Sequence, residues 1–159
     1  MRILVTGKNG QLGRSIYKIV NTTNGDNFSP NQFIFVGREE LDLSNNNSII
    51  NYFDNHDKFD IVINCAAYTA VDKAEEEQEL ANQINHLAIR QLAVIAKAQQ
   101  KKLIHISTDY VFDGKSGQPY LETDITNPHN VYGKTKLAGE KALQKIMPTN
   151  AIIIRTSWV

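Results

Sequence analysis

The chain has little of what several protein classes require. Its single cysteine, Cys65, excludes an internal disulfide and any metal site built from several cysteines. No apolar run approaches the length of a membrane span, and the run that begins at Ile3 is too short for a signal peptide. Lysine and arginine together number 17, as do aspartate and glutamate, so the basic excess typical of nucleic-acid-binding and membrane-surface proteins is missing. We therefore expect a cytoplasmic enzyme or binding domain, with neither nucleic acid nor membrane as a partner.

What remains is the composition of a globular domain. Apolar residues make up 42% of the chain and charged residues 21%, and 159 residues suffice for one domain with a substantial core. The polar stretch 21–32 has the composition of a loop between two elements.

A glycine-rich turn follows the first apolar run. Residues 3–5 predict a short buried strand, Gly7, Gly10 and Gly13 follow at intervals of three, and helical spacing begins after them. Strand, glycine turn and helix form the context of a dinucleotide-binding fingerprint. Gly7 would allow the tight turn, Gly10 would let the backbone approach a pyrophosphate, and Gly13 would let the helix pack closely. A plain strand-to-helix turn is the alternative. Three further residues of the turn belong to the same predicted cofactor site: Asn9, Gln11 and Leu12.

The second apolar run, residues 33–36, ends in Gly37 and Arg38. An acidic residue that binds the ribose is expected here in NAD-specific domains, whereas a guanidinium can bind a 2′-phosphate with two hydrogen bonds. We therefore expect NADP(H) or NAD(H) as cofactor, with NADP(H) only slightly preferred, because two glutamates follow directly. Asp42, with Leu43 beside it, is expected either near the adenine or as a loop or capping aspartate.

A third predicted strand, residues 60–64, leads into Cys65, Ala66, Ala67 and Tyr68. Small residues at the carboxyl end of a strand let the backbone approach a bound nucleotide. Cys65 is interpreted as a small buried side chain rather than a nucleophile. Tyr68 is either a ligand contact or a surface residue.

A long helix is expected from about residue 77 to residue 100. Its predicted buried stripe consists of apolar side chains: Leu80, Ile84, Leu87, Ala88, Leu92 and Ile95. Asn85 lies near that stripe, and a buried amide normally bonds to backbone or water, so we expect a structural role for it.

A fourth predicted strand, residues 103–107, places Thr108 at its carboxyl end. After a long loop over residues 113–130, a helix running to about residue 146 carries Tyr132 and Lys136, one turn apart on one face. An ammonium near a phenol lowers the phenol's pKa, and a phenol tuned in this way is a general acid or base for carbonyl and alcohol chemistry. A solvated helix face is the alternative for this pair. Residues 152–159 predict one more strand.

Taken together, the alternating elements predict an α/β fold, a Rossmann-type doubly wound parallel sheet with helices on both faces. The chain resembles the extended short-chain dehydrogenase/reductase family in four runs, residues 7–13, 64–72, 107–112 and 130–140. The resemblance implies Thr108, Tyr132 and Lys136 as catalytic residues, with Thr108, Asp109 and Tyr110 at the substrate. It implies NAD(P)H-dependent reduction of the C4 ketone of a dTDP-4-keto-6-deoxy sugar. A nucleotide-sugar epimerase or dehydratase, and a non-catalytic regulatory subunit, are the alternatives.

Proteins of this family are longer than this chain. The resemblance therefore implies that residues 1–159 are a truncated dinucleotide-binding domain without its C-terminal substrate domain, and that this fragment alone is inactive. A homodimer is one possible oligomeric state. Some family members hold magnesium at a dimer interface with a glutamate where this chain has Ser15, so no metal site is expected.

Overall fold

A computed structural model describes residues 1–22 and 31–157 of the chain. Most of the loop predicted over residues 21–32, and the last two residues of the strand predicted at 152–159, lie outside these ranges. Within them the chain forms one five-stranded sheet in the order β2-β1-β3-β4-β5, in which every neighbouring pair is parallel. The strands are β1 (Arg2–Thr6), β2 (Gln32–Val36), β3 (Ile61–Asn64), β4 (Lys102–Thr108) and β5 (Ala151–Thr156).

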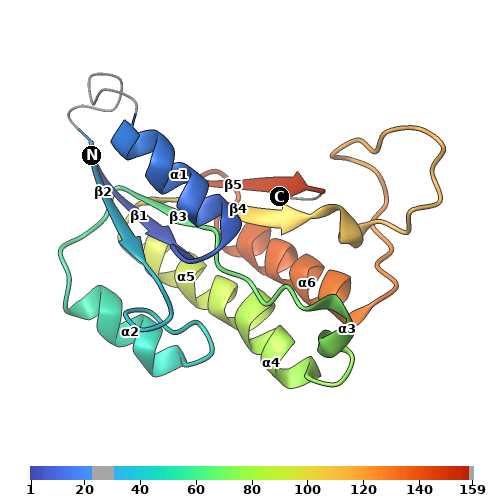
Figure 1. Cartoon of the computed structure of the whole chain (residues 1–159), viewed down its shortest axis with the longest axis horizontal. Helices are drawn as coiled ribbons and strands as arrows, with labels where there is room; N and C mark the ends of the chain where they lie inside the picture. Colours follow the sequence, from blue (N-terminus) through green and yellow to red (C-terminus); the bar gives the residue numbers. More distant parts are fainter. Residues whose placement is uncertain (23–30, 158–159) are drawn as a thin grey trace.

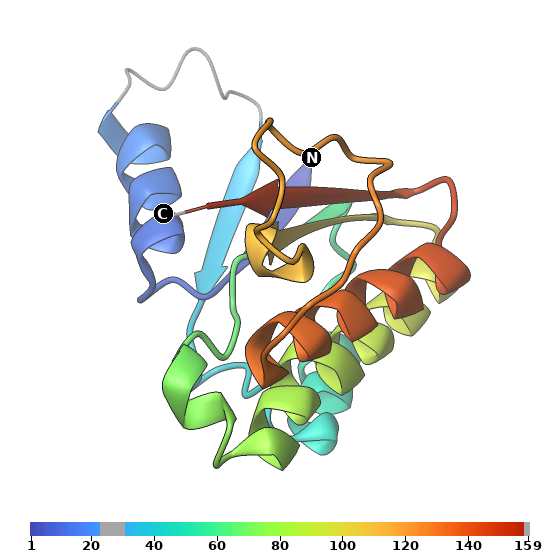
Figure 2. The same ribbon diagram turned by 90° about the vertical axis from the view of Figure 1, so that its right-hand side faces the viewer.

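Helices connect these strands as the sequence predicted. They are α1 (Gln11–Thr22), α2 (Asn46–Asp54), α3 (Val71–Ala74), α4 (Gln78–Asn82), α5 (Ala88–Ala98) and α6 (Val131–Ile146), together with the π-helical turn η2 (Gln83–Leu87) and the 3₁₀ turn η3 (Asp109–Val111). Figures 1 and 2 show α1 on one face of the sheet and α2, α4, α5 and α6 on the other. The predicted α/β, Rossmann-like fold is confirmed.

The core lies between the sheet and the layer of α2, α5 and α6. Leu4 and Leu103 from the strands, Ile49 from α2 and Leu92 from α5 are almost fully buried there. On the opposite face α1 packs at the β2 side of the sheet, where Tyr17 meets Phe35 edge to face at 5.1 Å. Burial of apolar side chains between the sheet and helices α2, α5 and α6 supplies most of the free energy that holds the layers together.

The strand order places a crevice between β1 and β3. The chain leaves β1 toward β2 on one side, while β3, β4 and β5 continue on the other, so the connections diverge between these strands. In open parallel sheets, ligands bind outside the carboxyl ends of the strands at such a point. The glycine turn after β1 and residues 65–68 after β3 both lie there.

The helix expected over residues 77–100 follows this path, but it is not one regular α-helix. The π-helical turn η2 interrupts it and shifts the buried face, so that Asn85 is buried and Leu87 is 39% exposed. Placing Leu87 in the buried stripe was therefore wrong, because a constant α-helical period was assumed through a segment where the period changes. None of the helices in the described ranges is both long enough and apolar enough to cross a membrane.

Candidate functional site

The glycine turn is built by close backbone contacts. Gly7 has a φ of +75°, and a Cβ there would lie 2.8 Å from the backbone nitrogen of Ala66. The N–H of Gly10 donates to the Gly7 carbonyl at 3.0 Å. A Cβ on Gly13 would lie 2.2 Å from that same carbonyl oxygen. Gly7 thus makes the turn and Gly13 lets α1 pack on it, as the sequence predicted.

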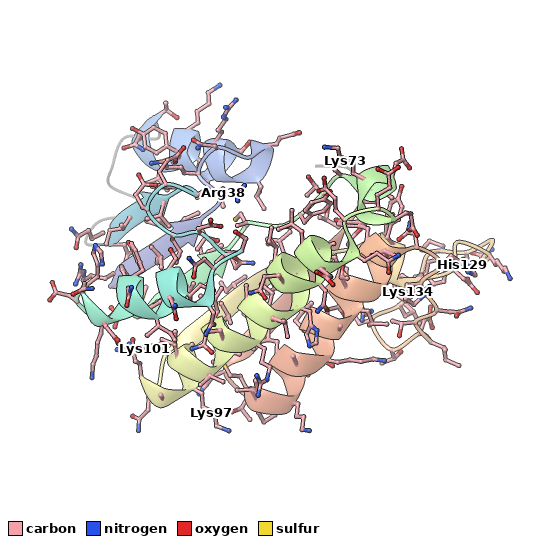
Figure 3. All side chains as sticks on the ribbon, turned by 90° about the horizontal axis from the view of Figure 1, so that it is seen from below. Arg38, Lys73, Lys97, Lys101, His129 and Lys134 are labelled. Carbon is pink, nitrogen blue, oxygen red and sulfur yellow. The ribbon has the colours of Figure 1, made fainter. Side chains whose placement is uncertain are left out.

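A cleft of about 960 Å³ opens at the carboxyl ends of the strands. Sixteen of the seventeen predicted site residues line it: Gly7, Asn9, Gly10, Gln11, Leu12, Arg38, Asp42, Leu43, Ala66, Ala67, Tyr68, Thr108, Asp109, Tyr110, Tyr132 and Lys136. The exception, Gly13, packs beneath the turn. Figure 3 labels Arg38 and Lys73, which come from the turn after β2 and from α3 and belong to different walls of this cleft.

The turn after β2 carries two acid–base pairs. The Arg38 guanidinium lies 3.4 Å from the Asp42 carboxylate, whose other oxygen accepts from the backbone N–H of Ser44 at 2.9 Å. Asp42 is therefore a loop-capping aspartate, one of its two predicted alternatives, and it also lines the cleft. The Glu40 carboxylate accepts from the Gly37 N–H at 2.8 Å and pairs with Lys8. Arg38 itself is 73% exposed, so its guanidinium is accessible to an anion.

The segment after β3 is clamped by Asn85. The Asn85 amide accepts from the Tyr68 backbone N–H at 2.9 Å and donates to the Tyr68 carbonyl at 3.0 Å. This confirms the structural role predicted for Asn85. The Tyr68 hydroxyl donates to Glu77 at 2.7 Å, and this hydrogen bond raises the pKa of Tyr68 to about 12. Burial raises the pKa of the Cys65 thiol to about 11, which agrees with its interpretation as an unreactive side chain.

Thr108 ends β4 and organises the short turn that follows. Its hydroxyl accepts from the Tyr110 N–H and donates to the Asp109 carboxylate, both at 3.2 Å. The Tyr110 ring meets the Tyr132 ring edge to face with centroids 5.6 Å apart. The fold thus brings Thr108, Asp109 and Tyr110 to the amino-terminal end of α6.

Helix α6 places Tyr132 and Lys136 at this point. Asn130 caps the helix by accepting from the Gly133 N–H at 2.7 Å. A Cβ on Gly133 would lie 2.3 Å from the Tyr110 carbonyl oxygen, so only glycine allows this close approach. Tyr132 is partly buried and Lys136 is only 1% exposed. The alternative of a solvated helix face is therefore excluded.

The prediction that Lys136 lowers the pKa of Tyr132 is wrong. Burial raises the pKa of Tyr132, and the nearby Asp109 carboxylate adds to the rise, while hydrogen bonding with Thr108 opposes it. Lys136 donates to the carbonyl oxygen of Ile106 at 2.7 Å. Burial lowers the pKa of Lys136 to about 8, although Glu140 opposes this. A raised pKa keeps the Tyr132 phenol protonated at neutral pH, which is the form that donates a proton.

A buried ion pair fixes α6 against the sheet, and the sequence pattern did not predict it. Glu140 is 1% exposed, accepts from the Ser107 hydroxyl, and pairs with Arg155 of β5 at 2.7 Å. The Arg155 guanidinium also lies 5.0 Å from the centre of the Phe112 ring. A glutamate on an amphipathic helix looks like a surface residue, so the sequence gives no signal for this pair.

Two buried polar residues beneath the cleft were also missed. His105 is fully buried on β4, and its Nε2 lies 3.4 Å from Lys136 Nζ. Asn64 is fully buried on β3, and its Nδ2 lies 3.0 Å from His105 Nδ1. The signal was present as a polar side chain within or at the end of an otherwise apolar strand.

Known proteins resemble this chain along its whole length. A dTDP-4-dehydrorhamnose reductase from Salmonella typhimurium is 44% identical over 163 residues, which cover 100% of this chain and 52% of the relative. A dTDP-4-keto-6-deoxy-D-glucose reductase from Streptomyces niveus is 38% identical over 158 residues, which cover 99% of this chain and 52% of the relative. The chain thus spans about half the length of the curated relatives it matches.

Solved structures of proteins with one of these names are also similar to this chain. A dTDP-4-dehydrorhamnose reductase from Clostridium acetobutylicum superposes with a TM-score of 0.89 at 42% identity, over 99% of this chain and 54% of the other. The enzyme of the same name from Bacillus anthracis, solved in complex with NADP, gives a TM-score of 0.86 at 36% identity, over 99% and 53%. These similarities confirm the resemblance that the four sequence runs indicated. The family described as the RmlD substrate binding domain matches residues 1–159, and the chain belongs to that family.

Proposed function

We propose that residues 1–159 form the dinucleotide-binding and proton-donating part of an NADPH-dependent reductase. Its substrate is a dTDP-4-keto-6-deoxy sugar, and the reaction reduces the C4 ketone to an alcohol. One observation carries the proposal: a single cleft joins the glycine turn and Arg38 to Thr108, Tyr132 and Lys136. Cofactor-binding and proton-donating groups therefore face one space.

The residues present fit a dinucleotide. A Cβ on Gly7 would collide with the backbone of Ala66, so only glycine at this position lets the carboxyl ends of β1 and β3 approach each other at the crevice. Helix α1 starts at Gln11, and the N–H groups of its first turn together with the helix dipole favour an anion such as a pyrophosphate. Asn9, Gly10, Gln11 and Leu12 would hold that group, and Ala66, Ala67 and Tyr68 would line the opposite side.

Arg38 supports NADP(H) over NAD(H). Its guanidinium is exposed at the cleft, and 3.4 Å is a long distance to each of its partners, Asp42 and Ser44. Such weak contacts leave its donors available to a 2′-phosphate. The NADP complex of the Bacillus anthracis relative points the same way.

The chain's own residues supply the proton and hold the substrate. When bound, the nicotinamide supplies the hydride. Tyr132, whose phenol is protonated at neutral pH, donates its phenolic proton to the ketone oxygen as that oxygen gains charge. The Thr108 hydroxyl donates a hydrogen bond to the same oxygen and stabilises the developing charge. Asp109 and Tyr110, next to Thr108, contact the sugar. Lys136 binds the nicotinamide ribose.

The relatives support the choice of substrate. Both reductases named above act, by their names, on deoxythymidine diphosphate sugars that carry a ketone. A cytoplasmic location and a homodimer remain predictions.

The test is a stoichiometry. The protein expressed from its complete reading frame is incubated with NADPH and dTDP-4-keto-6-deoxymannose, and cofactor oxidation is compared with product formation. We expect one NADPH oxidised for each sugar reduced. An epimerase or dehydratase would change the sugar without net NADPH consumption, and a regulatory subunit would do neither. Either of those results would reject the proposal.

A further inference from the structure

A row of polar side chains crosses the sheet beneath the cleft. The strand register pairs Thr6 of β1 with Asn64 of β3, and Asn64 with His105 of β4. All three side chains are buried, with exposed fractions of 2%, 0% and 0%. The row ends at Lys136 on α6, through the 3.4 Å approach of His105 Nε2 to Lys136 Nζ.

The direction of each hydrogen bond in this row follows from its donors. The Thr6 hydroxyl donates to Asn64 Oδ1 at 2.6 Å. This leaves Asn64 Nδ2 as the donor group, and it donates to the Ala66 carbonyl at 3.1 Å and faces His105 Nδ1 at 3.0 Å. An amide nitrogen has only hydrogens to offer, so His105 Nδ1 must accept.

The tautomer of His105 is then determined. Burial, followed by the neighbouring Lys136, holds the pKa of His105 well below its usual value, so the ring is neutral. A neutral imidazole that accepts at Nδ1 carries its hydrogen on Nε2. That N–H points at Lys136 Nζ, which already donates to the Ile106 carbonyl at 2.7 Å.

An ammonium has no lone pair to accept this hydrogen, whereas a neutral amine has one. We propose that Thr6, Asn64 and His105 act as positioning residues that favour the neutral amine of Lys136 over its ammonium before any ligand binds. Charging Lys136 is unfavourable unless His105 presents a bare Nε2, with its hydrogen on Nδ1. The Asn64 amide would then have to turn over, which reverses its hydrogen bond with the Thr6 hydroxyl and breaks the one to the Ala66 carbonyl.

The other groups around Lys136 do not reverse this. Glu140, one turn along α6, favours the ammonium, but its carboxylate is already paired with Arg155 of β5 and bonded by Ser107. From η3, Asp109 acts on Tyr132. The turn η2 contributes the uncharged Asn85 amide, which donates to Thr135 at 3.2 Å. Glu75, after α3, accepts from the Val131 N–H at the start of α6.

The inference deepens the proposed function, because it concerns the Lys136 of the same site. The charge of Lys136 is measured without cofactor or substrate, however. A protein that lacks reductase activity can therefore still pass this test, and a protein that fails this test can still be a reductase. If it holds, Lys136 is a group whose charge depends on its hydrogen bonds rather than a permanent cation beside Tyr132.

The test is a nitrogen-15 NMR titration of the protein expressed from its complete reading frame. Histidine labelling reports which ring nitrogen of His105 carries the hydrogen, and lysine labelling reports the titration of Lys136, whose signal is identified by its loss in Lys136→Arg. At a pH above the Lys136 midpoint we expect the Nε2–H tautomer, and we expect that midpoint to lie well below those of the exposed lysines.

Two variants sharpen the test. Asn64→Asp turns the donor facing His105 Nδ1 into an acceptor, so the ring should switch to Nδ1–H and the proton affinity of Lys136 should rise at least tenfold. Thr6→Val adds no charge but frees the Asn64 amide to turn, and it should shift the midpoint in the same direction by less. His129→Gln, on an exposed loop residue, should change neither signal.

A wild-type His105 with its hydrogen on Nδ1 at a pH above the Lys136 midpoint would overturn the proposal. So would a Lys136 midpoint that is unchanged in a folded Asn64→Asp protein. If Asn64→Asp does not fold, the wild-type tautomer alone decides the matter.

Discussion

The Lys136 amine donates to the carbonyl oxygen of Ile106 at a distance of 2.7 Å. The sequence had placed this amine beside the Tyr132 phenol as the source of a lowered phenol pKa. In the structure its hydrogen bond runs to the backbone of β4, and burial raises the pKa of Tyr132. The pair is thus arranged for a phenol that gives a proton rather than one that is already ionised.

Removing the Tyr132 hydroxyl should therefore abolish proton donation without emptying the cofactor site. We expect Tyr132→Phe to lower kcat by roughly 10²–10⁴-fold, the usual contribution of a positioned general acid, and to leave NADPH affinity nearly unchanged. Steady-state kinetics and fluorescence titration of NADPH measure the two effects. Tyr17→Phe, at a half-exposed residue of α1 that keeps its ring contact with Phe35 after the change, is the matched control and should behave as wild type. A Phe variant with nearly normal kcat would show that Tyr132 is not the acid.

Arg38 should discriminate between the two nicotinamide cofactors. Because its guanidinium would bind the 2′-phosphate, Arg38→Ala should raise the KM for NADPH about tenfold or more, the size of one charge-assisted hydrogen bond, with little change for NADH. Arg90→Ala, an exposed arginine on α5, serves as the control. Equal losses for both cofactors would mean that Arg38 does not contact the phosphate.

Two glycines should respond differently to a methyl group. A Cβ on Gly139 would lie 2.2 Å from the Asn85 carbonyl oxygen, where α6 crosses the π-helical turn. Gly139→Ala should therefore lower the free energy of unfolding by about 1–3 kcal/mol, the usual cost of overpacking. A Cβ on Gly117 meets nothing within 4 Å, so Gly117→Ala should be nearly neutral. Urea unfolding of both variants checks this, and equal stabilities would contradict the close helix contact.

Lys136 should also make stability depend on pH. Its pKa is about 8 in the folded chain, against 10.5 for an exposed lysine, so between these pH values the unfolded chain binds a proton that the folded chain lacks. Stability from this group therefore rises with pH across that window. The free energy of unfolding of wild type, minus that of Lys136→Met, should therefore increase by about 3 kcal/mol from pH 8 to pH 10.5. Because Cys65 and the tyrosines contribute equally to both proteins, their effects cancel. A pH-independent difference would refute the lowered pKa.

Much of this architecture could be predicted because it depends on local patterns. The apolar runs, the three glycines and the helical spacing after Gly13 each specify a local structure, and parallel strands bring their carboxyl ends to one edge. That rule is enough to place Thr108 near Tyr132 from the sequence alone. It also explains why nearly all the predicted site residues line one cleft.

What was missed depends on register and on changes of period. Nothing in the spacing of Asn64 and His105 along the chain indicates that β3 and β4 pair them side by side. Glu140 and Lys136 are charged residues on an amphipathic helix, which usually face solvent, and only the packed structure shows them buried with partners. Leu87 was misplaced because a π-helical turn shifts the face of a helix without a sequence signal.

The most direct measurement of the central claim follows one hydrogen. The protein expressed from its complete reading frame is given NADPH carrying deuterium at the transferable position of the nicotinamide, together with dTDP-4-keto-6-deoxymannose. Mass spectrometry and NMR of the product then locate the label. The account predicts one deuterium, bound to C4 of the sugar, in every product molecule. A product without deuterium, or with deuterium at another carbon, would contradict it.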